Sequence, residues 1–185
     1  MIVGVTGTIG SGKGTVVDYL VHQKGFKLYS VSDGFLASEA RRRRLEPDRI
    51  TRRNIANELR AISPTKLMES VLAEARDDIK AGVDIVADPQ HTVAEVKYIQ
   101  AQGGIVFGVD ADLEIRYERI KKRGSAKDNV TYEEFARHHA EEMKSDDANK
   151  NNLLDSIEAA DYGIQNNGTV EELYAQIDAV LAKLK

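Results

Sequence analysis

The chain has 185 residues, of which 42% are hydrophobic and 30% charged, with a net charge of −4 and no cysteine. This length suffices for one α/β domain with a substantial core. The acidic balance argues against a broad nucleic-acid-binding face, and the lack of cysteine excludes disulfides and thiolate metal sites. No apolar run reaches membrane-spanning length, and the first residues form a strand pattern rather than a signal peptide. We therefore expect a cytoplasmic protein that binds neither nucleic acid nor membrane.

The first fifteen residues carry the pattern Gly7-x4-Gly12-Lys13, placed between an apolar run and an amphipathic stretch. A strand–loop–helix context of this kind is what a phosphate-binding P-loop requires. Glycines let several backbone N–H groups point at one anion, and the helix N-terminus adds partial positive charge. The predicted phosphate-binding residues are Gly7, Thr8, Ile9, Gly10, Ser11, Gly12, Lys13, Gly14 and Thr15.

The residue after the P-loop lysine departs from the general pattern. Gly14 stands where Ser or Thr is usual, and Thr15 follows it. The form Gly-Lys-Gly-Thr resembles the nucleoside-monophosphate kinases. On that resemblance, the hydroxyl of Thr15 faces the phosphates or Mg²⁺.

Helical and strand patterns alternate along the chain, which favours a parallel sheet with helices on both faces. The second strand, residues 27–31, is followed by Ser32 and Asp33. Ligands of open α/β sheets gather at the carboxyl ends of strands. Asp33 is therefore predicted either to face a substrate or to cap the helix that follows, and one residue can do both.

Arginines are concentrated between residues 39 and 60 of this acidic chain. The planar guanidinium suits phosphate because it donates two parallel hydrogen bonds. For each arginine alone, a solvated helix face paired with Glu39, Glu46 or Glu58 is the competing interpretation, whereas we expect the cluster as a whole to bind phosphate. The eight arginines are Arg41, Arg42, Arg43, Arg44, Arg49, Arg52, Arg53 and Arg60.

The middle of the chain predicts a helix, a strand and a carboxylate at the strand's end. Ser63-Pro64 has the form of an N-cap followed by a first-turn proline, and predicts a helix to about residue 80. The apolar strand 83–87 ends at Asp88, where P-loop proteins place the carboxylate that binds Mg²⁺. Thr92-x-x-Glu95 predicts a capping box for the next helix.

The last third of the chain continues the alternation. Residues 105–109 predict a buried strand, and the helix predicted at 113–122 carries Arg119, with Arg123 directly after it. The polar stretch 124–129 has few apolar anchors and predicts a lid. Thr131-x-x-Glu134 and Thr169-x-x-Glu172 predict two further capping boxes, the second after a final strand at 160–164.

Taken together, these segments resemble the P-loop kinases of small phosphorylated metabolites. Residues 2–13 and 160–173 look like parts of dephospho-CoA kinases, whereas Ser32-Asp33, Leu45-Glu-Pro47 and residues 57–60 are more similar to adenylate-kinase-like proteins. The resemblance implies a three-layer α/β P-loop fold, with a parallel five-stranded sheet in the order 2-3-1-4-5. It also implies a single domain over residues 1–185, with an acceptor-binding helical region at about 33–63 and a lid at about 119–147.

The same resemblance implies roles for single residues. Lys13, Asp33, Arg119 and Arg123 would be catalytic, with Arg119 also contacting ATP. Asn167 and Gly168 would lie next to the adenine ring, and Thr15 and Asp88 would hold Mg²⁺. The acceptor would meet Asp33, Arg41, Arg49, Arg60 and His91.

Two departures concern the acceptor. These kinases often carry arginines that hold the acceptor phosphate where this chain has Ala37 and His91. We predict transfer of the γ-phosphoryl group of ATP to a nucleoside or deoxynucleoside monophosphate. The alternatives are dephospho-CoA kinase and a nucleotide-binding regulatory domain without transferase activity. The sequence leaves both a monomer and a homodimer open.

Overall fold

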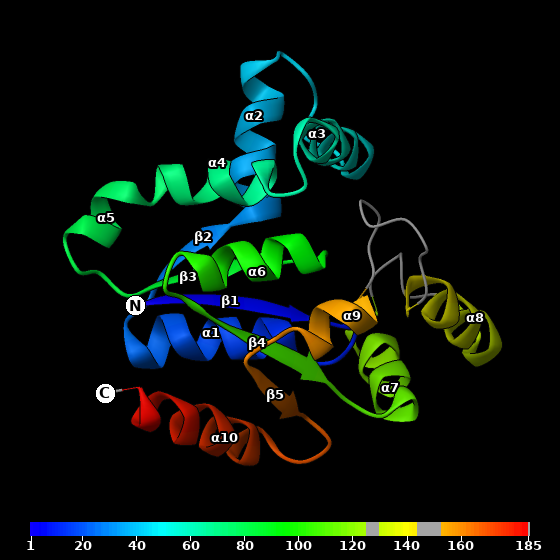
Figure 1. Cartoon of the computed structure of the whole chain (residues 1–185). Coiled ribbons are helices and arrows are strands. Elements are labelled where there is room, and N and C mark those ends of the chain that lie inside the picture. The colour runs from blue at the N-terminus through cyan, green and yellow to red at the C-terminus, as the bar shows by residue number, and fades with distance from the viewer. Residues whose placement is uncertain (125–129, 144–152, 185) are drawn as a thin grey trace.

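The computed structural model describes residues 1–124, 130–143 and 153–184. Five parallel strands form one sheet in the order β2-β3-β1-β4-β5 (Figure 1). The predicted order 2-3-1-4-5 is therefore confirmed. The strands are β1 (Ile2–Gly7), β2 (Lys27–Ser30), β3 (Ile85–Asp88), β4 (Ile105–Asp110) and β5 (Tyr162–Gln165).

Helices connect the strands and cover both faces of the sheet, and a short π-helical turn, η1 (Val31–Leu36), follows β2. The helices are α1 (Lys13–Lys24), α2 (Ala37–Arg42), α3 (Arg49–Ile62), α4 (Lys66–Glu74), α5 (Arg76–Lys80), α6 (Val93–Ala101), α7 (Leu113–Arg123), α8 (Tyr132–Met143), α9 (Leu153–Glu158) and α10 (Val170–Lys183).

Two apolar cores lie on the two faces of the sheet, which gives the predicted three layers. Val3 and Val5 of β1 pack with α1 and α10 on one face. Ile85 and Ala87 of β3 pack with α4 and α6 on the other. Figure 1 shows α1 and α10 on one side of the strands and α4 and α6 on the opposite side. Central strands buried on both faces explain the continuous apolar runs of the sequence.

The parallel register brings the polar ends of three strands to one edge. Gly7 pairs with Val109 one residue before Asp110, and Ser30 pairs with Asp88. The loop after β1, Asp88 and Asp110 therefore lie at the carboxyl edge of the sheet, where open α/β proteins bind ligands.

The predicted helix from Ser63-Pro64 to residue 80 is wrong at its start and in its continuity. Ser63 instead ends α3, and its backbone N–H donates to Leu59 O. The proline pushes Ser63 into an extended conformation, so the next helix begins only at Lys66. Ala75 then separates α4 from α5.

One element was not predicted, and the predicted lid is only partly described. The helix α9 packs on β1 and β4. Of the lid predicted at about 119–147, residues 125–129 and 144–147 lie outside the described residues. Among the helices that the structure describes, none combines the length and apolar character needed to cross a bilayer.

The capping box of α10 provides a test of the local assignments. Thr169 Oγ1 accepts the Glu172 N–H at 3.2 Å, and a Glu172 carboxylate oxygen accepts the Thr169 N–H at 2.8 Å. We expect Thr169→Ala to lower the free energy of unfolding by about 1 kcal/mol. Thr169→Ser keeps the hydroxyl and should lie near wild type in the same urea titration. Equal stability of both variants and wild type would contradict the assignment.

Candidate functional site: the P-loop edge of the sheet

The loop between β1 and α1 has the backbone of a phosphate cradle. Gly7 and Gly12 take φ values of 144° and 98°, which favour glycine. A Cβ on Gly7 would lie 2.0 Å from Val109 O, so the loop leaves β1 in contact with β4. No side chain of the described residues caps the first turn of α1. The N–H groups of that turn are therefore available to an anion.

Lys13 spans the loop from the first turn of α1. Its ammonium donates to Gly7 O at 2.7 Å and to Thr8 O at 2.9 Å. The charge is thus held over the strand–loop junction, where bound phosphates would lie in a P-loop. This placement supports the predicted role of Lys13.

One polar contact fixes the loop to the neighbouring strand, and a second lies within the loop. The Thr8 hydroxyl donates to Asp110 Oδ1 at 2.6 Å, and the Ser11 hydroxyl donates to Thr8 O at 2.8 Å. The buried Arg116 guanidinium lies next to the same aspartate, with Nε 3.9 Å from Asp110 Oδ1. Sequence reasoning did not assign Asp110 a role, although it ends a buried strand just as Asp88 does.

Arg119 and Asn166 lie against the loop from the other side. Asn166 Nδ2 donates to Ser11 O at 2.7 Å, and a Cβ on Gly12 would lie 2.2 Å from that nitrogen. Arg119 donates to Ser11 O at 3.5 Å and to Asn166 Oδ1 at 3.4 Å. Arg119 therefore lies against the P-loop, and its predicted contact with ATP stays a prediction. Arg123, one turn later on the same helix, is exposed.

The resemblance predicts that Asn167 and Gly168 lie at the adenine ring. In the structure, the residue of this segment that contacts the P-loop is Asn166. Asn167 instead exchanges hydrogen bonds with Asp112, accepting its N–H at 2.8 Å and donating to its carboxylate at 3.0 Å. Gly168 is exposed in the turn before α10. Their predicted contact with adenine stays a prediction, and Asn166 joins the candidate site.

Asp88 is a buried carboxylate near the Lys13 ammonium. Burial raises the pKa of Asp88 to about 6, and the charge of Lys13 opposes that rise. Asp88 Oδ1 is buried and has no hydrogen-bond partner among the described residues. A carboxylate oxygen is a ligand that Mg²⁺ favours, and one or two carboxylates commonly suffice when phosphates complete the shell. The residue therefore fits the predicted cation site.

Gly14 and Thr15 lie in the first turn of α1. Thr15 is half-buried, and Gly14 is exposed, with open space where a Cβ would stand. No group of three or more His, Cys, Asp or Glu side chains suited to a metal occurs within the described part of the chain. A metal here would therefore take most of its ligands from phosphate and water.

Asp33 follows β2 at the same edge, but its side chain is 85% exposed and forms an ion pair with Arg52. The prediction that Asp33 caps the next helix is wrong, because Ser30 is the cap and its hydroxyl accepts the Asp33 N–H. Its predicted contact with an acceptor stays a prediction.

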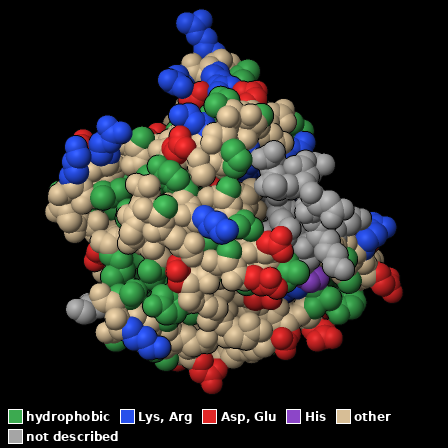
Figure 2. Space-filling view, viewed as in Figure 1, with side chains coloured by type: hydrophobic (Ala, Val, Ile, Leu, Met, Phe, Trp, Pro, Cys, Tyr) green, Lys and Arg blue, Asp and Glu red, His purple; other side chains and the backbone are tan. Residues whose placement is uncertain are grey.

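The arginine cluster divides into compensated and exposed charges. Arg43 binds both Glu39 and Glu58, and Arg42 binds Glu39. Burial alone would raise the pKa of Glu39, but these two arginines hold it below its ordinary value. Four further members are exposed and have no ion-pair partner among residues 1–124, 130–143 and 153–184: Arg41, Arg44, Arg49 and Arg53. Figure 2 shows Lys and Arg side chains gathered on the projecting end that α2 and α3 form in Figure 1.

Arg60 lies in a buried ion pair. Its Nε donates to Glu95 Oε1 at 2.9 Å, and the side chains of Arg60 and Glu95 are 7% and 0% exposed. The other Glu95 oxygen accepts the His91 N–H at 2.8 Å. The predicted capping box at Thr92 is therefore only half formed. Glu95 N donates to Thr92 Oγ1, but its carboxylate binds Arg60 and His91 instead.

His91 and Ala37 occupy the positions where the resembled kinases often carry arginine. Ala37 is 4% exposed at the junction of η1 and α2. His91 is half-buried, and burial together with the charges of Arg60 and Lys13 lowers its pKa to about 3. The imidazole is therefore neutral at physiological pH.

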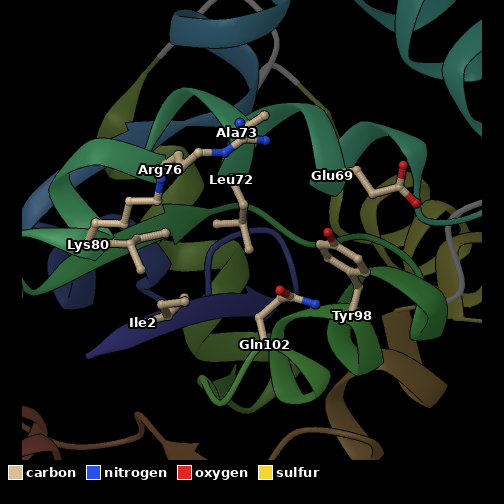
Figure 3. A pocket seen from close by; sticks show the side chains of 9 residues that line it. Ile2, Glu69, Leu72, Ala73, Arg76, Lys80, Tyr98 and Gln102 are labelled. Carbon is tan, nitrogen blue, oxygen red and sulfur yellow. The ribbon is translucent and has the colours of Figure 1, made fainter.

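A cavity lies at the opposite edge of the sheet. This cavity of about 310 Å³ is lined by Ile2 at the start of β1, by Leu72 and Arg76, and by Tyr98 of α6 (Figure 3). Because it lies at the amino edge of the parallel strands, it is separate from the P-loop.

Comparison with known proteins places this geometry in a family. The family model described as "AAA domain" matches residues 3–144. A UPF0200 protein of Pyrobaculum aerophilum is 30% identical over 187 residues, which cover 100% of this chain and 98% of that protein. The chain belongs to the UPF0200 family. As an AAA-domain member of this family, it carries its P-loop at the start of the matched region.

Solved structures, two of them of kinases, have the same fold. TT1252 from Thermus thermophilus is 22% identical with a TM-score of 0.62, covering 100% of this UPF0200 chain and 98% of its own. The dephospho-CoA kinase from Campylobacter jejuni is 16% identical with a TM-score of 0.58, covering 99% and 96%. The shikimate kinase from Aquifex aeolicus is 14% identical with a TM-score of 0.56, covering 99% and 97%. The UPF0200 chain therefore has a P-loop kinase-like α/β fold.

The Arg60–Glu95 pair gives a stability prediction. Arg60→Met keeps the length of the side chain but leaves the buried Glu95 carboxylate without its cation. We expect a loss of about 3–5 kcal/mol in the free energy of unfolding, measured by urea titration. Arg53→Met on the exposed face of the same helix should change it by less than about 0.5 kcal/mol. Equal effects of the two variants would contradict the buried pair.

Asp88 gives a pH prediction. Because its pKa is raised to about 6 in the folded state, the protonated form is favoured on folding. Its contribution to stability is complete below about pH 4 and is lost as the pH rises through about 6, a change of about 3 kcal/mol.

Asp88→Asn should remove this dependence. Urea titrations from pH 4 to 8 in EDTA should therefore show the stability of wild type minus that of the variant falling as the pH rises. A difference that is flat or rises with pH would contradict the raised pKa.

Proposed function

We propose that this chain is an ATP-dependent phosphotransferase that acts on a small acceptor of nucleotide type. The observation that carries the proposal is the Lys13 ammonium, held across the P-loop with Arg119 on the same loop and Asp88 nearby. The kinase-like fold supports it. The sequence-based prediction of a nucleoside monophosphate is the first acceptor to test, and dephospho-CoA is the second.

Phosphoryl transfer needs positioning and charge neutralisation more than covalent chemistry. Open N–H groups at the start of α1 would bind the phosphates of ATP, and Lys13 would move from the loop carbonyls to the β- and γ-phosphates. Arg119 would add positive charge as the transferred group passes to the acceptor. Asp110 and Asn166 would hold the loop in shape through Thr8 and Ser11.

Mg²⁺ fits this site through Asp88, with Thr15 as the second predicted contact. When bound, the ion would neutralise charge on the β- and γ-phosphates. The raised pKa of Asp88 implies that cation binding and proton binding compete at this carboxylate.

A second candidate is a nucleotide-binding regulatory domain that does not transfer phosphate. The buried Ala37 and the neutral His91 favour it, because neither supplies the positive charge that the resembled kinases often use for the acceptor. Binding of ATP without transfer to any acceptor would support this candidate.

Lys13 provides the direct test. ADP release should be measured with ATP, Mg²⁺ and a panel of nucleoside and deoxynucleoside monophosphates, dephospho-CoA and no acceptor. We expect acceptor-dependent turnover in the wild type and a loss of at least about 100-fold in kcat/KM for Lys13→Ala.

Lys24→Ala, at the far end of the same helix, is the matched control and should remain within about twofold of wild type. Lys24 pairs with Asp178 and is remote from the loop. Transfer by Lys13→Ala at the wild-type rate would refute the role of the P-loop in the reaction.

A further inference from the structure

A carboxylate holds the backbone of His91, and the imidazole ring takes no part in this contact. His91 stands three residues after Asp88, at the carboxyl end of β3. Its backbone N–H donates to Glu95 Oε2, and the same carboxylate holds Arg60 through Oε1. The main chain of His91 is therefore anchored by a fully buried group, which leaves the imidazole free to serve another contact.

The ring presents a hydrogen-bonding atom that the described chain does not satisfy. His91 Nδ1 is buried and has no partner in the part of the chain that the structure covers. A buried polar atom without a partner costs about 1–3 kcal/mol, and such atoms are usually completed by water or a ligand. The charge of Lys13 acts on the His91 imidazole, so a molecule bound at the P-loop is a candidate partner for Nδ1.

The charges around His91 indicate which chemical group its imidazole can bind. The imidazole is neutral because burial and the cations Arg60 and Lys13 disfavour its protonated form. Arg60 is compensated by Glu95, and Lys13 serves the P-loop. A neutral imidazole offers one donor and one acceptor, which suits a hydroxyl. A phosphate dianion at the same place would need a cation that His91 does not supply.

We propose that His91 contacts the reacting group of the acceptor and selects an uncharged hydroxyl over a phosphate. This inference rests on the proposed phosphotransferase function and narrows its acceptor to a nucleotide-type molecule with a free sugar hydroxyl. Dephospho-CoA belongs to that class, whereas transfer to the phosphate of a nucleoside monophosphate does not. His91 is a specificity contact that accepts or donates a hydrogen bond and stays neutral.

The test uses acceptors that distinguish the two reacting groups by product. When AMP is incubated with ATP and Mg²⁺, ATP becomes ADP in either reaction, and the γ-phosphoryl group converts AMP to a second ADP if the phosphate reacts or to an adenosine bisphosphate if a ribose hydroxyl reacts. The label of γ-labelled ATP therefore appears in ADP in the first case and in the bisphosphate in the second. Radiolabel from γ-labelled ATP, followed by chromatography, separates these products, and dephospho-CoA is assayed in parallel. We expect the wild type to phosphorylate hydroxyls at least about tenfold faster than phosphates, the factor that one hydrogen bond of ~1.4 kcal/mol contributes.

Three variants of His91 complete the test. His91→Asn keeps a neutral side chain with hydrogen-bonding capacity and should retain the preference for hydroxyls. His91→Arg supplies the missing charge and should shift the product ratio toward phosphates by at least about tenfold. His91→Ala should lower kcat/KM for hydroxyl acceptors about tenfold. The alanine variant tests the contact even if His91→Arg does not fold. Binding of a fluorescent ATP analogue should stay within about twofold in every folded variant.

The outcomes separate the two proposals. Wild-type transfer to phosphates at least as fast as to hydroxyls would overturn the role of His91 while leaving the phosphotransferase in place. An unchanged product ratio in folded His91→Arg, or unchanged kcat/KM in His91→Ala, would overturn it too. Nucleotide binding without transfer to any acceptor would overturn the proposed function and this inference together.

Discussion

The close approach of β1 to β4 at Gly7 is the constraint on which the site depends. Gly7 lies so near Val109 O that a side chain cannot fit, and its φ of 144° turns the chain out of the sheet. Because the strands are parallel and in register, this turn opens beside Asp110 of β4 and at the same edge as Asp88 of β3. The loop, the buried carboxylate and the helix N-terminus therefore meet without any long-range adjustment of the chain.

The proposed acceptor side depends on a different interaction, that of the buried Glu95 carboxylate of α6. Both of its oxygens are used, one by Arg60 of α3 and one by the His91 backbone. The pair connects α3 to α6, and the same carboxylate fixes the backbone of His91, three residues after the predicted Mg²⁺ carboxylate. A buried ion pair contributes little net stability against an apolar substitute, but it strongly penalises loss of one partner. In this protein the main effect of the Glu95 carboxylate is to fix the positions of Arg60 and His91.

Charge compensation distinguishes the two halves of the site. On the proposed ATP side, Lys13 donates to backbone oxygens of the loop, and Arg119 donates to a loop carbonyl and to the amide oxygen of Asn166. On the proposed acceptor side, Arg52 and Arg60 are paired with carboxylates. Two cations are therefore held at the loop where a triphosphate would bind. The exposed arginines of α2 and α3 lie on the projecting end, and their predicted role in binding phosphate depends on how an acceptor reaches them.

Local patterns alone specified the P-loop, the alternation of strands and helices, and the place of Asp88, while the resemblance supplied the strand order. These features follow from short-range spacing and from the rule that parallel strands end at one edge. The partners of the arginines did not follow, because Arg60 and Glu95 are 35 residues apart and meet only where tertiary packing brings α3 next to the start of α6. Likewise, only the tertiary structure showed that Asn166 rather than Asn167 touches the P-loop, since adjacent residues at the end of a strand point to opposite sides.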